Sequence, residues 1–539
     1  MDKRQANAGA ASHAESSAIE QDVRELHELG YAQELRRVMS GFSNFAISFS
    51  IISVLTGAVI LYGWGLRYGG PGENGLGWPL VSIFTLCIAA CMAEIASAYP
   101  TAGGLYYWAS VMGNRHWGWW TAWLNLGGLV TAVAGINWAA AAFFNRIVLQ
   151  EIFGMTPDLG VQVVVMAGIT LVQVAINVFG IRLVAWLNDL SVWVHVLGVL
   201  AIALLLFLFA KHRNGLDFPF RIAPGDPAIA AQPPFWGTFG IFGAFLLGLL
   251  QAQWTYTGYD ASAHTAEETI SARRGSANGI FMSVAVSAIV GYVLLLAITY
   301  ALPPVAETLA ADASGTPAVA YTLIENLAGL GVFLSFVIVV AMILCGMSAI
   351  ASTGRMIFAF ARDGGVPFSR FFSHVSLAQR SPDVALCTAG ILAVLITVYA
   401  YVSARGDAAA ASTTIGIITG MSTALLYWAY GLPILLGLRS GVWRERRTWS
   451  LGTRSRALQV ISIAWIVVIS ILFLWRPDNE YAFRDTVGFL VLLVAYYALW
   501  AIRNFKGPQA RRAEELIARE EAIGETQHGG VAPVGSTGD

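Results

Sequence analysis

The ten residues from Gln251 to Asp260, QAQWTYTGYD, carry many hydrogen-bonding side chains within a stretch that otherwise resembles a membrane helix. The residues just before them, 239–250, are almost wholly apolar. Hydrocarbon offers no hydrogen-bond partners, so an interrupted backbone at this depth must lie against protein or a solvated cavity. An acidic side chain inside a membrane usually marks a functional site. We therefore expect this run to hold a small solute.

A second apolar segment, 42–64, is interrupted in the same way. Its polar residues are Ser48, Ser50, Ser53 and Thr56-Gly57, and the Thr-Gly pair recurs as Thr257-Gly258. Paired interruptions in corresponding places of two halves indicate inverted repeats with a binding site between them. The alternative is that small polar residues only let the helices pack closely. The matching positions favour the site, because close packing does not require them.

The ends of broken helices determine what such a site can hold. One half-helix exposes unpaired carbonyls and the other exposes unpaired N–H groups, which favour an anion. A carboxylate would suit the N–H groups around 54–57, and an ammonium would suit the carbonyls of 49–53 and 253–255. A zwitterionic amino acid satisfies both ends, and aromatic side chains can close over it or stack on its cation. The predicted substrate-binding residues are Ser53, Val54, Leu55, Thr56, Gly57, Gln253, Trp254, Thr255, Tyr256, Gly258, Tyr259 and Asp260.

Two roles are open to Asp260. It could neutralise a substrate amine, or it could cap the half-helix that continues toward Thr269. The full capping box is missing, since no Glu or Gln lies three residues later. Its place just after Gly258 favours the cap.

The composition puts these residues in a lipid bilayer. The chain is 56% hydrophobic and 12% charged, with a mean hydropathy of +0.63. A soluble domain carries about twice that charge. The net charge of −1 argues against a nucleic-acid partner. Neither paired acids nor a His-Glu-x-x-His cluster is found, and Cys87 and Cys91 have no partners for a metal site, so we expect no enzyme, no cofactor and no metal.

Apolar segments of about 20 residues mark membrane helices. The sequence predicts an all-α polytopic protein with twelve spans, at 42–64, 78–99, 118–144, 161–180, 187–210, 237–265, 279–302, 329–355, 384–401, 414–437, 458–475 and 487–502. With an even number, both termini lie on one side. If that side is the cytoplasm, about 24 Lys and Arg lie inside and about 8 outside, as the positive-inside bias requires. We expect both termini in the cytoplasm and the protein in the plasma (inner) membrane.

The spans predict an organisation in two halves. A cytoplasmic tail, 1–41, includes a possible amphipathic surface helix over 19–38, and it precedes a first five-helix repeat at 42–210. An extracellular loop at 211–236 leads to a second repeat at 237–437. Two further helices follow within 438–502, and a polar cytoplasmic tail covers 503–539.

Three motifs resemble one family of transporters. They are Glu94–Trp108 (EIASAYPTAGGLYYW), Gly258–Thr269 (GYDASAHTAEET) and Arg355–Pro367 (RMIFAFARDGGVP). The first resembles the signature of the amino acid–polyamine–organocation (APC) superfamily. The second is similar to its amino acid/choline branch, which includes GABA and choline permeases. The resemblance covers about residues 35 to 505 and implies a leucine-transporter-like 5+5 fold, alternating access, and substrate recognition at the breaks of spans one and six.

The chain departs from the family pattern at the first break, which reads Ser53-Val-Leu-Thr-Gly57 and has fewer glycines than usual. In several proton-coupled relatives, a lysine of span five faces that break. His195 occupies the corresponding place here and could take up and release a transported proton, because histidine titrates near physiological pH. The alternative is a neutral histidine that is hydrogen-bonded within the bundle.

Polar residues elsewhere are expected to have structural roles. Glu94 and Arg355 lie near span ends and suit gating or loop anchoring. We expect solvated or loop-to-loop pairs from Glu267, Glu268, Arg273 and Arg274, and hydrogen bonds between helices from Asn125, Asn137 and Asn177.

The sequence thus predicts a secondary active transporter that imports an amino acid or related amine such as GABA by alternating access, together with a proton. The alternatives are choline or polyamine uptake and amino acid exchange. A choline-like cation has no carboxylate and would use Asp260 and the aromatic residues instead. A solute sensor is disfavoured, because neither tail suits a sizeable output domain.

Overall fold

The computed structural model describes residues 3–235, 237, 240–376, 378–404, 410–475, 480–508, 514–518 and 520. The described chain is all-helical, and its only β-pairing consists of isolated bridges. The predicted C-terminal tail lies largely outside the described residues, including everything from 521 to 539.

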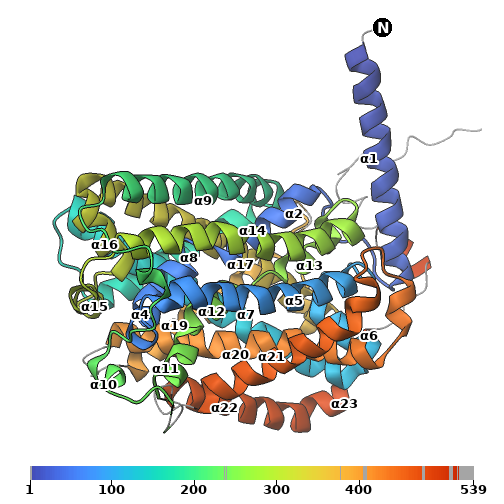
Figure 1. The fold of residues 1–539 in the computed structure, drawn as a ribbon. Coiled ribbons are helices and arrows are strands. Elements are labelled where there is room, and N and C mark those ends of the chain that lie inside the picture. The colour runs from blue at the N-terminus through green and yellow to red at the C-terminus, as the bar shows by residue number, and fades with distance from the viewer. Residues whose placement is uncertain are drawn as a thin grey trace, which may run out of the picture.

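Ten long helices run in roughly one direction through the bundle (Figure 1). They are α5 (Trp78–Ala96), α7 (Arg115–Phe144), α8 (Leu159–Val178), α9 (Ile181–Phe209), α14 (Ala272–Tyr300), α17 (Gly329–Arg362), α19 (Asp383–Ser403), α20 (Ala410–Arg439), α21 (Ser455–Trp475) and α22 (Glu480–Tyr496). Outward-facing side chains such as Trp193, Leu197 and Leu204 of α9 are large, apolar and exposed. Such a surface requires lipid around it.

The first predicted span is broken. It consists of α2 (Gly41–Ile52), α3 (Gly57–Ile60) and α4 (Tyr62–Tyr68). The Ser40 side chain caps the start of α2 by accepting the N–H of Ser43, and Ser53 ends α2 in the left-handed conformation, with a φ of 31°. Even with this break, 41–60 counts among eleven described segments long and apolar enough to cross a membrane.

The sixth predicted span, 237–265, is divided more deeply. It contains α11 (Gly240–Gly248), α12 (Leu250–Thr255) and α13 (Ala261–His264), with a non-helical stretch at 256–260. None of these pieces is long enough to count as a spanning helix, so the described residues show eleven candidate spans. The total of twelve spans therefore stays a prediction, whereas the predicted interruption is observed.

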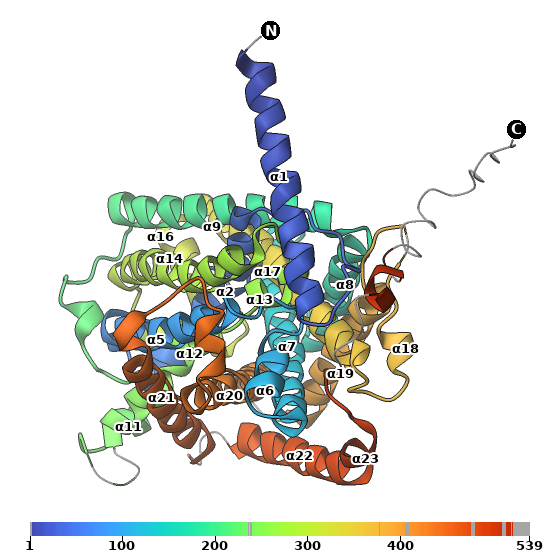
Figure 2. The same cartoon turned by 90° about the vertical axis from the view of Figure 1, so that its right-hand side faces the viewer.

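Short helices, together with the longer α1, gather at the two ends of the bundle (Figures 1 and 2). The α15 end has α4, η1 (Glu73–Gly77), η3 (Phe218–Phe220), α10 (Pro227–Ala230), α15 (Val305–Ala313) and α16 (Ala318–Leu327). The α1 end has α1 (Lys3–Glu28), α6 (Gly104–Met112), η4 (Ala266–Glu268), α18 (Ser369–Phe372), η5 (Val442–Glu445), η6 (Gly452–Arg454) and α23 (Ile502–Asn504). Two π-helical turns, η2 (Asn145–Ile152) and η8 (Tyr497–Ala501), extend α7 and α22.

The end of α1 and the last described residue, Glu520, lie together at the α1 end of the bundle. The Glu520 carboxylate lies 2.8 Å from His27 Nε2 and accepts the N–H of Gln33 at 2.6 Å. An even number of crossings requires this arrangement. The helix predicted over 19–38 is wrong in its second half, because α1 stops at Glu28 and Gly30 follows in the left-handed conformation.

Candidate functional site between two broken helices

The two breaks touch each other at two glycines. A Cβ atom on Gly57 would lie 2.7 Å from the Cα of Thr255, and one on Gly258 would lie 2.2 Å from Ile51 Cγ2. Gly258 also has a φ of +93°, which residues other than glycine rarely adopt. The breaks of α2–α3 and α12–α13 therefore form one site, and only residues without a Cβ fit at its two contacts.

A small cavity lies between the breaks. Its volume of about 10 Å³ leaves room for about one water molecule. Four predicted residues line it: Thr56, Gly57, Trp254 and Thr255. The sequence analysis missed five other lining residues: Ile51, Ile52, Ala132, Ile136 and Thr257. An amino acid fits only after these side chains move.

Several buried polar atoms at the second break have no partner among the described residues. They are both amide atoms of Gln253, the indole Nε1 of Trp254 and the hydroxyl of Tyr259. All three side chains are at most 3% exposed, and Trp254 also lines the cavity. Buried polar atoms without partners are costly, so each needs an explanation. A polar ligand at the break could supply the missing partners.

Of the backbone N–H groups at the first break, two are hydrogen-bonded within the break and two are not. The Ser53 carbonyl accepts the N–H groups of Thr56 and Gly57, at 2.7 and 3.1 Å. Those of Val54 and Leu55 have no hydrogen-bond partner among the described residues. Of the N–H groups expected from the sequence to bind a carboxylate, these two are therefore the ones without a partner, although neither residue lines the cavity in this conformation. At the second break, the Trp254 carbonyl accepts the N–H of Thr257 at 3.0 Å.

Three predicted side chains contact helices away from the cavity. Val54 lies with Trp78 against Gly291 of α14, and Leu55 lies against Gly198 of α9. The hydroxyl of Tyr256 is 2.5 Å from Ser82 Oγ of α5. These residues support the breaks, and only their backbone can face a solute in this conformation.

The expectation that Asp260 caps α13 is wrong. Its side chain makes no capping hydrogen bond. Oδ2 instead accepts from Asn125 at 2.9 Å and lies 3.2 Å from His264 Nε2, while Oδ1 accepts from Tyr430 at 3.0 Å. The Tyr430 hydroxyl also accepts the N–H of Gly258 at 3.1 Å. Tyr430, 170 residues away in the chain, thus connects Asp260 to the break itself.

His195 connects α9 to the first break. Its Nδ1 lies 2.8 Å from the Ser191 carbonyl and its Nε2 lies 2.7 Å from Ser53 Oγ. A neutral imidazole with its proton on Nδ1 satisfies both contacts, because the Ser53 hydroxyl can donate to Nε2. Ser53 Oγ is also 2.6 Å from Thr56 Oγ1, and Thr56 lines the cavity. The Ser53 hydroxyl therefore links His195 to a residue of the cavity wall.

Two ion pairs lie just after the second break, toward the α1 end. Glu267 accepts hydrogen bonds from both terminal nitrogens of Arg362, at 2.8 and 3.0 Å. Glu268 forms an ion pair with Arg355. All four side chains are buried, so the expectation of solvated pairs is wrong for Glu267 and Glu268. Burial would raise the pKa of Glu267, but the Arg362 guanidinium outweighs it and lowers that pKa below its usual value.

Other expected polar contacts are observed. Glu94 accepts from Arg447, the N–H of Leu451 and Ser455, and so anchors the loop before α21. Asn137 bonds Thr170 and Gln173 of α8, and Asn177 bonds the Met347 carbonyl of α17.

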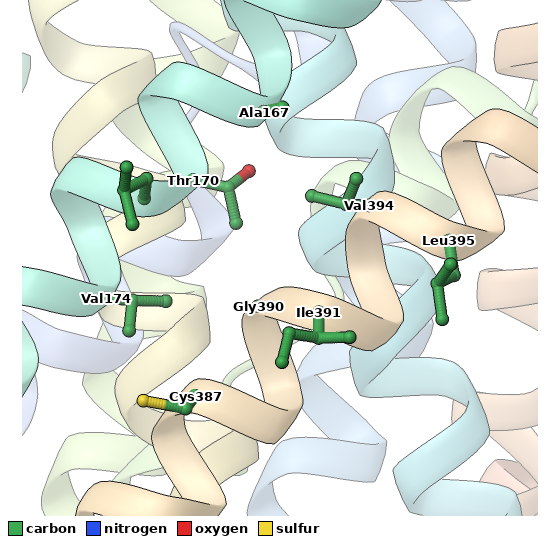
Figure 3. Close-up of a pocket in the computed structure, with 9 residues that line it drawn as sticks. Ala167, Thr170, Val174, Cys387, Gly390, Ile391, Val394 and Leu395 are labelled. Carbon is green, nitrogen blue, oxygen red and sulfur yellow. The ribbon is translucent and has the colours of Figure 1, made fainter.

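A larger pocket lies away from the breaks, between α8 and α19 (Figure 3). Its volume is about 350 Å³. Its walls are nearly all apolar, and the side chains of Leu171, Ile391 and Leu395 in them are exposed on the outside of the bundle. Because both helices are candidate membrane spans, lipid chains would meet this pocket, and it offers little to a polar solute.

The chain is similar to known permeases over most of its length. The profile of a family described as amino acid permease matches residues 39–494. The amino-acid permease BAT1 of Arabidopsis thaliana is 34% identical, over 90% of this chain and 95% of its own. A BAT1 homologue from Oryza sativa subsp. japonica is 32% identical over 90% and 94%. Amino-acid permease 2 of Neurospora crassa is 27% identical over 95% and 94%.

The broken helices, the apolar exterior and this similarity agree. The chain is a member of the amino acid permease family, within the APC superfamily.

Proposed function

We propose that this permease is a secondary active transporter that imports an amino acid or related amine, such as GABA, by alternating access and together with a proton. We further propose a leucine-transporter-like 5+5 arrangement, in the plasma (inner) membrane, with the α1 end in the cytoplasm. The observation that carries the proposal is the cavity between the two breaks, together with the buried polar atoms of the second break that have no partners among the described residues.

The chemistry of these atoms suits a zwitterion. The unpaired N–H groups of Val54 and Leu55 suit a carboxylate, since N–H groups at a helix break attract anions. The carbonyl end of α12 near Thr255 suits an ammonium group, with Trp254 and Tyr259 close by to shield it. The Gln253 amide can donate to one group or accept from the other.

Alternating access requires that both ways into the cavity can close. At the α1 end, the Glu267–Arg362 and Glu268–Arg355 pairs provide the closure. At the α15 end, the loop at 211–236 joins the end of span one, where Arg221 and Gly225 bond Gly72 and Leu66 through their backbones. We propose that these two closures open in turn.

Solute counterflow tests the proposed substrate class. Purified protein in liposomes loaded with unlabelled amino acid is expected to take up the same labelled amino acid, with GABA tested first. Choline at about a hundredfold excess is expected to leave this exchange unchanged, because without a carboxylate it cannot use the N–H groups. Exchange of choline or polyamines with none of amino acids would contradict the proposal and support the amine-uptake alternative.

The coupling ion is a separate part of the proposal. His195 remains the proton carrier predicted from the sequence, and that prediction fails if His195→Gln leaves pH-driven accumulation intact.

A further inference from the structure

Asp260 and His264 form a fully buried pair at the start of the second half of span six. His264 Nε2 lies 3.2 Å from Asp260 Oδ2, and neither side chain is accessible to solvent. On its other side, His264 Nδ1 lies 3.0 Å from the Ala102 carbonyl. Both ring nitrogens therefore face oxygen atoms that act as acceptors when Asp260 is ionised.

This geometry determines where protons must lie. The Ala102 carbonyl can only accept, so Nδ1 carries a hydrogen. A second proton is needed between Nε2 and Oδ2, because two lone pairs would otherwise face each other. It belongs either to an imidazolium or to a carboxylic acid, and in both cases the pair as a whole is neutral. The remaining tautomer, with one proton on Nε2, sets the Nδ1 lone pair against the Ala102 carbonyl.

We propose that the Asp260–His264 pair binds a transported proton. The inference rests on the proposed transport function and identifies a group that couples it to a pH gradient. Without this proton the pair carries one negative charge in a buried site, which is costly unless compensated. Loss of the proton therefore favours separation of Asp260 from His264, and binding of the proton draws them together.

The surrounding groups support this assignment. The elements around α13 carry titratable or charged side chains that include Tyr106 and Tyr107 of α6, Glu267 and Glu268 of η4, Arg273 and Arg274 of α14, Arg355 and Arg362 of α17, and Tyr427 and Tyr430 of α20. Arg355 and Arg362 are each paired with a glutamate. Among the described residues, His264 is the only basic group that hydrogen-bonds Asp260.

The pair is connected to both the break and the ion pairs. Toward the break, the Tyr430 hydroxyl bridges Asp260 and the N–H of Gly258. Toward the α1 end, Ala102 accepts from His264 through its carbonyl and donates through its N–H to Glu267 Oε1, at 3.0 Å. Separation of the pair would disturb both connections, so a proton bound here can bias the gate and the substrate site together.

Asp260→Asn tests the assignment. The new amide can donate to His264 Nε2 and accept from Tyr430. Asn125 can flip its own amide so that its unpartnered Oδ1 accepts from the new NH₂ group. The contacts are therefore kept without a titratable group at position 260. In liposomes, we expect the ratio of accumulation driven by an inward pH gradient to amino acid counterflow to fall about tenfold or more below that of wild type. A ratio close to that of wild type would overturn the inference.

Asp383→Asn is the matched control. Asp383 also contacts a histidine, His374, at 2.8 Å, but this pair is at the surface of the bundle. Its replacement is expected to leave pH-driven accumulation unchanged. His195→Gln is measured in parallel and decides the role of His195 independently.

A measurement on wild type covers the case in which Asp260→Asn also loses counterflow. Nitrogen-15 histidine spectra, with His264→Gln for assignment, are expected to show a proton on His264 Nδ1, and a neutral ring protonated only on Nε2 would overturn the inference. If wild type exchanges amino acids but no pH gradient drives their accumulation, this inference fails alone. If wild type exchanges no amine-bearing solute, the proposed function fails and this inference with it.

Discussion

Replacement of Gly258 by alanine is expected to reduce amino acid uptake about a hundredfold or more. The residue has a φ of +93°, and its Cβ would lie 2.2 Å from Ile51 Cγ2. Backbone strain costs about 1–3 kcal/mol and overpacking costs about as much again. If the strain lowers the stability of the transporting conformation by about 2.8 kcal/mol, the population of that conformation, and with it uptake, falls about a hundredfold. The change also falls at the contact between the two breaks, where a solute must be accommodated.

The control for this prediction is Gly168→Ala. Gly168 lies within α8 with open space around the position of a Cβ, so alanine there is expected to leave uptake unchanged. The double variant Gly258→Ala with Ile51→Ala removes the clash but keeps the backbone strain, so it should recover part of the uptake. Uptake near that of wild type in the single variant would show that the two breaks do not touch as described.

Replacement of Arg355 by methionine is expected to lower the free energy of unfolding by about 3–5 kcal/mol, because it leaves the Glu268 carboxylate buried without its partner. Both side chains are fully buried. Thermal unfolding in detergent, followed by tryptophan fluorescence, measures the effect.

Two further variants separate charge from packing at this ion pair. Arg355→Met together with Glu268→Leu removes both charges and is expected to recover most of the stability, since apolar replacement of a whole buried pair is often tolerated. Arg221→Met removes a cation from a pair that is more than 60% exposed, and its effect should stay below about 1 kcal/mol. Wild-type stability of Arg355→Met alone would show that Glu268 does not depend on Arg355 for its charge balance.

The sequence predicted the features that depend on local pattern. Long apolar runs gave the spans, and the repeated Thr-Gly pairs located both breaks to within a few residues. Four of the predicted site residues, from Thr56 to Thr255, line the cavity. These predictions succeed because a chain that crosses hydrocarbon has few alternatives to a helix. Polar residues that interrupt an apolar run are therefore easy to recognise in the sequence.

The sequence did not predict contacts between distant segments. Ala132 and Ile136 line the cavity, but they lie in a uniformly apolar part of α7 with no distinguishing signal. The partners of Asp260 come from α7 and α20, and without them the cap was the simpler interpretation. Glu267 and Glu268 read as solvated for the same reason, because the arginines that pair with them lie about ninety residues later.

The central claim is that a zwitterionic amino acid binds between the two breaks. An electron cryomicroscopy reconstruction of the protein with its best-exchanged amino acid tests this most directly. The account predicts density in an enlarged cavity between Gly57 and Thr255, with the carboxylate at the N–H groups of Val54 and Leu55 and the amine toward the carbonyl end of α12. Solute density elsewhere in the bundle, or a carboxylate bound by Arg355 or Arg362, would contradict it.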